Sequence, residues 1–367
     1  MLKKLLMVVA GSAFIALGVG ESTQAVNFKI VASGLDNPRK LTFGPDGDLY
    51  VTEAGRGGTG PCFQGPEGYS CYGLTGAVTR IHKGTKQSVV TGLPSLASPN
   101  GSNANGPTAI AFGSSGKAYV LIGLGAAPSI RNQLNAPNLG KLLVINNINK
   151  INQGASLATV ADIAGYEALH NPDGARVDSN PYDLLIKGGT AFVVDAGGND
   201  LLSVNLNNSN VGLKTVFPTR KVANPAGGSD IPLESVPTTV EDCKGSLYVG
   251  ELTGVPFPVG AANIYQVGAN NQPTIYARGF TNVIDIAFAP QGGLYVLEYA
   301  KNSISSGNQT GALIYVAPNG NRSTIASDGL INPTGLAVDR NGTIYISNNS
   351  MGKNNGQIIS ISAPKLK

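Results

Sequence analysis

The sequence predicts an all-β protein, a six-bladed β-propeller with four-stranded antiparallel blades in which the N-terminal strand closes the last blade. Three observations carry this prediction: a phrase that recurs six times, a glycine turn at the same place in each copy, and a chain start that copies the missing end of the last repeat. Propeller blades are small sheets that bury their faces only by stacking on neighbouring blades.

The repeat is clearest in its first copy, which runs from Gly34 through the turn Pro45-Asp46-Gly47 to Glu53. An aromatic residue marks the second strand of each copy and returns about every 50 to 70 residues. The six aromatic residues are Tyr50, Tyr119, Phe192, Tyr248, Tyr295 and Tyr345. Six copies predict six similar structural units.

Residues 1–25 are expected to be a signal peptide, because Lys3 and Lys4 precede an apolar run, residues 5–19, that is followed by polar and small residues. An uncleaved membrane anchor is the alternative, but the run is short for a bilayer span. We therefore predict one domain, residues 26–367, in a periplasmic or secreted protein that is monomeric and has no membrane segment after cleavage.

Charge and cysteine usage narrow the class further. The 26 Lys and Arg residues nearly balance the 22 Asp and Glu residues and form no basic stripe, which excludes a nucleic-acid partner. Cys62 and Cys71 lie nine positions apart in a Gly-rich insertion, residues 55–76, and are expected to form a disulfide in an oxidising compartment. Cys243 is expected to be an inert thiol, because no His lies near it in the repeat register.

The first strand of each copy is nearly continuously apolar, as expected for an inner strand whose sheet is covered on both faces. These strands are residues 39–43, 108–112, 182–186, 238–240, 283–288 and 334–338. A glycine-containing hairpin turn follows each of them. Third strands are predicted at residues 77–81, 141–145, 262–267 and 312–317, and fourth strands at residues 88–90 and 274–277.

The two chain ends predict closure of the ring. Residues 30–35 copy the fourth-strand ending at residues 325–330, whereas the last copy stops after its third strand, residues 357–361. We expect residues 28–32 to lie beside residues 357–361 and supply the missing outer strand, which removes an exposed sheet edge.

Two rings of polar residues are expected at one mouth of the tunnel. The ring before the inner strands is Asn37, Asn180, Asn282 and Asn332, with Asn105 one place out of register; the ring that ends the second strands is Glu53, Ile122, Asp195, Glu251, Glu298 and Asn348. Such oxygen donors suit a hard cation such as Ca²⁺ or direct contact with a ligand. They equally suit a structural role, in which they accept hydrogen bonds from turn amides.

Charged residues are also expected inside the tunnel. Lys40, Asp183 and Asp285 occupy equivalent places in the first, third and fifth copies. Because a buried charge needs a partner, they are expected either to pair across the tunnel through water or to form a polar funnel for a small ligand. Neither His82 nor His170 is placed for a Ser-His-Asp arrangement, so no catalytic residue is predicted.

Long strings of this chain resemble the ScyD/ScyE family, propeller proteins named after the scytonemin gene cluster of cyanobacteria. The resemblance spans the repeats and includes Glu53-Ala54-Gly55-Arg56 with the Cys62 and Cys71 insertion, and residues 164–167, 171–174, 194–202, 248–254, 279–282 and 295–298. It implies a secreted or periplasmic propeller, in some members tied to late assembly or export of an indole-derived pigment. It implies no active site.

Function is therefore expected to be binding of a small, possibly indole-derived, metabolite or of an envelope partner protein. Arg56 and the two polar rings are expected near the ligand, with Tyr69, Tyr72 and Phe257 as apolar contacts. The alternative comes from the wider resemblance to gluconolactonase-like propellers and is a metal-dependent hydrolase or lactonase. The positions that would match its metal ligands are Arg39, Thr108, Tyr182, Thr238, Ile284 and Thr334, none of which is a carboxylate or an amide. A shift of one residue would bring in Asp183 and Asp285.

Overall fold

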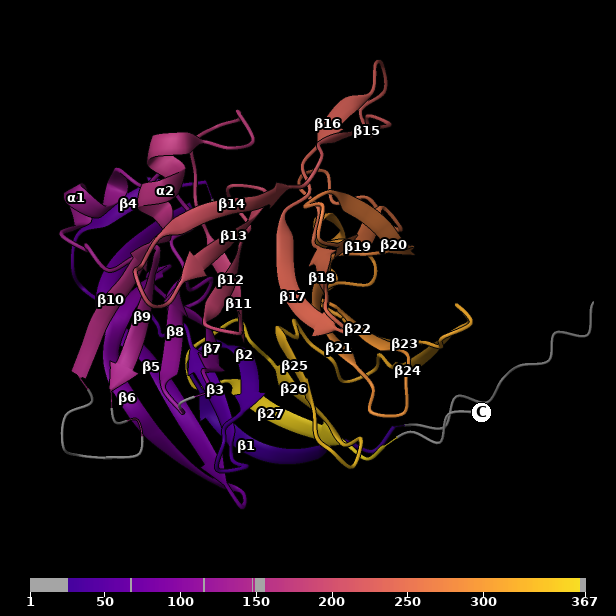
Figure 1. Ribbon diagram of the computed structural model, residues 1–367, viewed down its shortest axis with the longest axis horizontal. Coiled ribbons are helices and arrows are strands. Elements are labelled where there is room, and N and C mark those ends of the chain that lie inside the picture. The colour runs from indigo at the N-terminus through magenta and orange to yellow at the C-terminus, as the bar shows by residue number, and fades with distance from the viewer. Residues whose placement is uncertain (1–25, 67, 115, 147, 149–155, 364–367) are drawn as a thin grey trace, which may run out of the picture.

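The computed structural model describes residues 26–363 except 67, 115, 147 and 149–155. The expected signal peptide, residues 1–25, lies outside the described residues. The chain forms six antiparallel sheets arranged as the blades of a propeller (Figure 1).

The inner strands line the central tunnel. They are β2 (Pro38–Phe43), β7 (Pro107–Phe112), β11 (Pro181–Lys187), β17 (Pro237–Cys243), β21 (Val283–Phe288) and β25 (Gly335–Val338). Each inner strand contacts the next, and β25 returns to β2, so the ring is closed. The repeat predicted all six inner strands. Each predicted end lies within one residue of the observed end, except that β17 extends three residues further.

The second strands carry the repeated aromatic residue and are mostly buried. They are β3 (Leu49–Glu53), β8 (Ala118–Ile122), β12 (Thr190–Asp195), β18 (Ser246–Glu251), β22 (Leu294–Glu298) and β26 (Ile344–Asn348). The aromatic ring packs across the blade boundary: Tyr50 meets Phe112 and Tyr248 meets Phe288 edge-on, each at 4.9 Å between ring centroids. This interblade contact explains why the aromatic recurs.

The outer strands complete the blades. The third strands are β5 (Gly68–His82), β9 (Lys141–Asn146), β13 (Asp200–Asn205), β19 (Ala262–Val267), β23 (Ala312–Val316) and β27 (Gly356–Ile361). The fourth strands are β6 (Thr85–Ala97), β10 (Ser156–Asp162), β14 (Val211–Val216), β20 (Pro273–Phe280), β24 (Arg322–Ala326) and β1 (Lys29–Leu35).

The first strand closes the ring, as predicted from the sequences of the two chain ends. Strand β1 pairs antiparallel with β27, with Lys29 opposite Ser360 and Leu35 opposite Gly356. The last blade thus combines both ends of the domain, and Figure 1 shows β1 beside β27. The same aromatic contact seals this boundary, since Phe43 of β2 meets Tyr345 of β26 at 5.5 Å.

The first blade differs from the prediction in length. Strands β5 and β6 continue well beyond residues 77–81 and 88–90, and the short strand β4 (Cys62–Gly65) pairs with the start of β5. Cys62 and Cys71 form the predicted disulfide and lie directly opposite each other in this pairing. Part of the Gly-rich insertion is therefore a β-hairpin rather than a loop, because its backbone groups pair with one another.

Three short elements were not predicted from the sequence. A helix α1 (Ile130–Leu134) and a helix α2 (Ile163–His170) belong to the second blade and the segment after it, and a two-stranded ribbon, β15 (Arg220–Val222) with β16 (Ile231–Leu233), precedes the fourth blade. Asp162 accepts a hydrogen bond from the amide of Gly165, and Asn171 ends α2 in a left-handed conformation. These two capping residues were the available sequence signals for α2. Among the residues that the structure describes, no helix has the length and apolar character needed to cross a bilayer.

Candidate functional site

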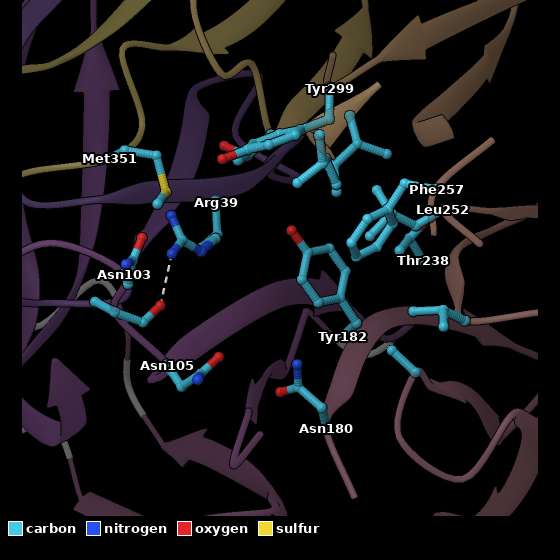
Figure 2. Close-up of a pocket in the computed structure, with 16 residues that line it drawn as sticks. Arg39, Asn103, Asn105, Asn180, Tyr182, Thr238, Leu252, Phe257, Tyr299 and Met351 are labelled. Carbon is cyan, nitrogen blue, oxygen red and sulfur yellow. Dashed lines mark hydrogen bonds between the residues drawn. The ribbon is translucent and has the colours of Figure 1, made fainter. Parts of the chain in front are cut away.

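A pocket of about 340 Å³ opens at one mouth of the tunnel. It is lined by residues at the starts of inner strands and by residues in the loops that follow second strands, so both sets of loops reach the same face, as the sequence predicted. Its apolar lining includes Tyr182, Leu252, Phe257, Ile284, Tyr299 and Met351, and its polar lining includes Arg39, Asn103, Asn105, Asn180, Thr238 and Thr334. In Figure 2 Arg39 and Met351 lie on one side of the pocket and Leu252 and Phe257 on the other.

The blades alternate in what they contribute to this mouth. Odd blades place the large residues Arg39, Tyr182 and Ile284 at equivalent positions near the start of the inner strand, where even blades place a threonine. The threonine hydroxyls tie neighbouring blades together: Thr238 Oγ1 donates to the carbonyl of Val283, and Thr334 Oγ1 donates to that of Pro38, both at 2.7 Å. Six large side chains would not fit around the tunnel, so alternation leaves space for the pocket.

Gly335 illustrates this steric limit at the next position down the tunnel. A Cβ atom on Gly335 would lie 2.5 Å from the carbonyl oxygen of Arg39, closer than any normal contact. The corresponding residue of the neighbouring blade is Lys40, whose long side chain crosses the tunnel. A small residue on one blade therefore accompanies a large one on the next.

Arg39 is the charged group of the pocket, and its side chain is buried. Its guanidinium donates to the carbonyl of Ser350 at 2.9 Å and to the carbonyl of Ala104 at 2.5 Å, with longer contacts to the carbonyls of Asn37 and Pro38. Within the part of the chain that the structure describes, no Asp or Glu forms an ion pair with it, and Arg39 is 7% exposed. Backbone carbonyls orient this cation but leave its charge without a counter-ion, which attracts an anion to the pocket.

Below the pocket, the three charged residues predicted in the tunnel form a direct ionic tie. Lys40 Nζ lies 2.6 Å from Asp285 Oδ1 and 3.4 Å from Asp183 Oδ2, and it also donates to the carbonyl of Ile284 at 2.9 Å. Amide groups of neighbouring blades hold the carboxylates: Val240 donates to Asp183 and Leu336 donates to Asp285. The contact is direct rather than through water, because Lys40 is long enough to reach both carboxylates.

This ionic tie separates the mouth pocket from a second cavity of about 270 Å³ further along the tunnel. The second cavity is lined by the middle of the inner strands and includes Glu241, where burial and the charges of Asp285 and Asp183 raise the pKa to about 8. Tyr182 connects the two levels, since its ring lies above Lys40 with 5.9 Å between the ring centroid and Nζ. A ligand that enters the mouth therefore meets Tyr182 and Arg39 before the ionic tie.

The residues that end the second strands form a repeated strand-end latch. In it, the side-chain oxygen accepts a hydrogen bond from the backbone amide just before the inner strand of the same blade. The pairs are Glu53 with Asp36, Asp195 with Asn180, Glu298 with Thr281 and Asn348 with Ile331, all at 2.6 to 2.7 Å. The latch joins the two loops at the mouth of the first, third, fifth and sixth blades, whereas the second blade has the apolar Ile122 at this position.

The fourth blade replaces this amide contact with an ion pair. Both carboxylate oxygens of the buried Glu251 contact the guanidinium of Arg220, at 2.6 and 2.9 Å, and Ser235 donates to the same carboxylate. Arg220 belongs to the β15–β16 ribbon, which has no counterpart in the other repeats, so the repeat pattern could not reveal this partner.

The predicted rings are thus distributed among the blades rather than gathered at a point. Among the described residues, no group of three or more His, Cys, Asp or Glu side chains is placed to hold a metal ion. None of the residues that line the mouth pocket is Asp, Glu, His or Cys. Asp183 and Asp285, the acids that a shift of one residue would bring in, contact Lys40 and backbone amides.

The asparagines before the inner strands bridge loops. Asn37 and Asn282 adopt the left-handed conformation, with φ of 50° and 47°, as does Asn332. The amide group of Asn37 donates to the carbonyls of Gly55 and Gly101, and that of Asn282 donates to the carbonyl of Leu252. Of the four ring residues, Asn180 lines the pocket.

The remaining predicted contacts are placed as follows. Arg56 lies outside the pocket lining, with a half-exposed side chain that pairs with Asp36 at 2.5 Å. Phe257 lines the pocket, whereas Tyr69 and Tyr72 belong to the disulfide hairpin. The sequence did not indicate that Tyr299 and Met351 line the pocket. Tyr299 follows the latch residue Glu298 by one position and Met351 follows Asn348 by three, so they occupy no common position in the repeat.

Fold and site together define the protein as a six-bladed β-propeller with a mainly apolar pocket at one mouth of its tunnel. No family model matches the chain, and no curated protein matches it. The chain is structurally similar to a gluconolactonase from Xanthomonas campestris, at a TM-score of 0.50 and 9% sequence identity, over 92% of this chain and 89% of that one.

Two further solved structures show weaker similarity. A putative gluconolactonase superposes with a TM-score of 0.49 and 9% identity over 92% of both chains, and a chain of a nidogen/laminin complex with a TM-score of 0.44 and 12% identity over 76% of this chain and 84% of that one. At such low identities the similarity concerns the propeller fold alone.

Proposed function

We propose that this protein binds a small, flat, mainly apolar molecule that carries an acidic group, in the mouth pocket and with the acid facing Arg39. The observation that carries the proposal is the buried guanidinium of Arg39, which has carbonyl partners and no counter-ion among the described residues, at the wall of an otherwise apolar pocket. An aromatic or indole-derived carboxylic acid has this combination of features.

The size and lining of the pocket support such a ligand. A volume of about 340 Å³ lies at the lower end of the range for small-molecule sites. Tyr182, Phe257 and Tyr299 offer aromatic surfaces, and such surfaces favour stacking with a planar ring. Arg39 would then supply a charge-assisted hydrogen bond to the acidic group.

Binding is better supported than hydrolysis. The lactonase alternative requires a metal ion and a general base at the tunnel mouth, and the lining of the pocket contains no carboxylate, imidazole or thiolate. Asp183 and Asp285, the two acids that a one-residue shift would have supplied, are tied to Lys40 beneath the pocket. We therefore propose a binding or accessory role, with no chemical step.

The resemblance to the ScyD/ScyE family extends the proposal to location and context. We propose export to the periplasm or the exterior, with residues 1–25 removed, and action as a monomer. In that compartment the protein would bind a metabolite, or a partner protein, in late assembly or export of an indole-derived pigment of the scytonemin type. The disulfide between Cys62 and Cys71 is compatible with an oxidising compartment.

The chain contains no Trp, so the fluorescence of an indole ligand can be followed without a tryptophan background from the protein. We expect indole-3-acetate to bind the purified protein and the uncharged indole-3-acetamide to bind at least about tenfold more weakly, which corresponds to about 1.4 kcal/mol. Arg39→Met should abolish this preference for the acid. Arg56→Met is the matched control, because Arg56 lies outside the pocket, and should leave both affinities unchanged.

Two results would contradict the proposal. Equal affinity for the acid and the amide would show that Arg39 does not select an anion. Loss of the preference in Arg56→Met, with retention in Arg39→Met, would place the ligand outside this pocket. Thermal melting of each variant by circular dichroism distinguishes lost binding from lost folding, since Arg39 also holds backbone carbonyls.

A further inference from the structure

A second site lies outside the lining of the mouth pocket, where helix α2 meets the turn between β12 and β13. Three buried carboxyl groups surround Gly198 in this turn. A Cβ atom placed on Gly198 would lie 3.1 Å from Glu167 Oε2 and 3.6 Å from the Cγ atoms of both Asp195 and Asp200. Glu167, Asp195 and Asp200 are each 1% exposed, so water does not solvate their charges freely.

The three carboxyl groups differ in their partners. Asp195 is satisfied by the protein: its Oδ1 accepts from the amides of Asn180, Gly197 and Gly198, and its Oδ2 accepts from Ser179 Oγ. It therefore already carries a full set of hydrogen bonds.

Glu167 and Asp200 are in the opposite situation. Both carboxylate oxygens of Glu167 and the Oδ1 atom of Asp200 are buried and have no hydrogen-bond partner of normal geometry, although the backbone amide of Asp178 lies close enough to Glu167 to favour its charged form. A fourth such oxygen, Oδ1 of Asn171, belongs to the residue that ends the helix carrying Glu167. Buried polar groups are nearly always paired, so the unpaired carboxylate oxygens of two residues that both adjoin Gly198 indicate that a partner outside the chain completes them.

No basic side chain neutralises this cluster. Neither Glu167 nor Asp200 forms an ion pair with any described Lys, Arg or His. The charges that reach Glu167 most strongly are those of Asp195, Asp173 and Asp178, which are also acidic. Burial and these charges raise the pKa of Glu167 to about 7, although the backbone amide of Asp178 opposes the shift, and burial raises the pKa of Asp200 well above its usual value.

We propose that Glu167 and Asp200, with the amide oxygen of Asn171, bind a divalent cation, and that this cation is Ca²⁺. The donors are all oxygens, with no His nitrogen or Cys sulfur among them, which is the ligand type that Ca²⁺ prefers. Two carboxylates and one amide form the donor set, while Asp195 orients the Gly197-Gly198 turn from outside it.

This cation site adjoins the mouth pocket through one short stretch of chain. The Asp195 latch holds Asn180 on one side and the turn that begins at Ala196 on the other, and both Asn180 and Ala196 line the pocket. A bound cation would therefore stabilise one wall of the pocket. The site is proposed on its own contacts and does not depend on which molecule the pocket binds.

The test uses the purified protein freed of metal with EDTA and then titrated with CaCl₂ alone. Isothermal titration calorimetry should show one Ca²⁺ per chain, and the melting temperature should rise by about 4 °C when free Ca²⁺ exceeds the dissociation constant a hundredfold. Glu167→Gln and Asp200→Asn should each abolish this response. Because both substitutions remove charge from a cluster of like charges, the metal-free variants should melt at or above the temperature of the metal-free wild type.

Glu298→Gln is the matched control, since it neutralises a buried carboxylate at the tunnel mouth that belongs to another blade. It should retain the full Ca²⁺ response, whereas a cation held by the ring at the mouth would lose it. Absence of calcium binding by the wild type at millimolar concentration would overturn the proposal. So would a calcium response that survives in Glu167→Gln with Asp200→Asn.

A protonated pair of acids is the competing explanation of the unpaired oxygens. In that case lowering the pH would stabilise the metal-free protein, the two variants would remove that pH effect, and CaCl₂ would leave the melting temperature of the wild type unchanged at pH 7.5. That combination of results would also overturn the proposal.

Discussion

Replacing Lys40 with Met should destabilise the propeller by about 3 kcal/mol, because it removes the cation from two buried carboxylates. The ammonium group of Lys40 lies 2.6 Å from Asp285 and 3.4 Å from Asp183, and the side chains of all three residues are nearly inaccessible to solvent. Breaking a buried ion pair by removing one partner typically costs about 3 to 5 kcal/mol. We expect the lower value, because backbone amides still donate to both carboxylates.

The loss should also depend on pH. Burial raises the pKa of Asp285 from 3.8 to about 6, and the charge of Lys40 opposes that rise. Between about pH 4 and pH 6 the folded state therefore binds this proton more tightly than the unfolded chain, so stability is lost as the pH rises through this window. Without Lys40 the pKa of Asp285 rises further and the window extends upward. The deficit of Lys40→Met should therefore be larger at pH 8 than at pH 5.

The assay is thermal unfolding at pH 5 and pH 8, measured by differential scanning calorimetry. A loss of about 3 kcal/mol corresponds to a fall in melting temperature of about 4 °C for a domain of this size, because the entropy of unfolding grows with chain length. Lys187→Met is the matched control, since Lys187 pairs with Asp242 on the surface and its loss should cost less than about 1 kcal/mol. Adding Asp183→Asn and Asp285→Asn to Lys40→Met should restore most of the stability. A fall that matches the control, or one that is equal at both pH values, would refute the reasoning.

Three further predictions concern the latch, a strained residue and the disulfide. Burial raises the pKa of Glu298 to about 7, so wild-type stability should decline as the pH rises from about 4.5 to 7. Glu298→Gln keeps an acceptor for the amide of Thr281 and should reduce that decline by up to about 3 kcal/mol, as measured by urea titrations at several pH values. Val236 has a φ of 50°, which is unfavourable for a β-branched residue, and Val236→Asn should raise the stability by about 1 kcal/mol; a lower melting temperature would contradict this. Cys62→Ser should lower the stability by about 2 to 3 kcal/mol, because the link to Cys71 closes a short loop, and should leave binding of indole-3-acetate unchanged, since neither cysteine lines the pocket.

The architecture could be predicted from the sequence because a propeller is built from local repeats. Each blade follows from an apolar run, a glycine turn and an aromatic strand, so the inner strands were located from periodicity alone. Closure was also predictable, since the first strand copies the end of the fifth repeat and pairs with β27. Departures from the repeat, such as helix α2 and the β15–β16 ribbon, were missed because they occur once.

The candidate site was predictable only in part. The sequence indicated which residues would reach the mouth, and Phe257 and Asn180 do line the pocket. It left open whether the acidic residues that end the second strands meet one another, and in the structure each latches its own blade. The sequence showed only that Arg39 stands at a position unsuited to a metal ligand. The structure shows that its buried guanidinium contacts backbone carbonyls and that no described carboxylate pairs with it.

The sequence by itself determined the number of blades, their order and the strand that closes them, because these depend on hydrogen bonding and burial between neighbours along the chain. Only the tertiary structure decided which side chains meet across the tunnel, since Lys40, Asp183 and Asp285 are up to 245 residues apart. The same holds for Glu167 and Asp200, where an element outside the repeat brings two carboxylates to one turn. Whether a buried charge is paired depends on distance in space, and spacing in a sequence does not give that distance.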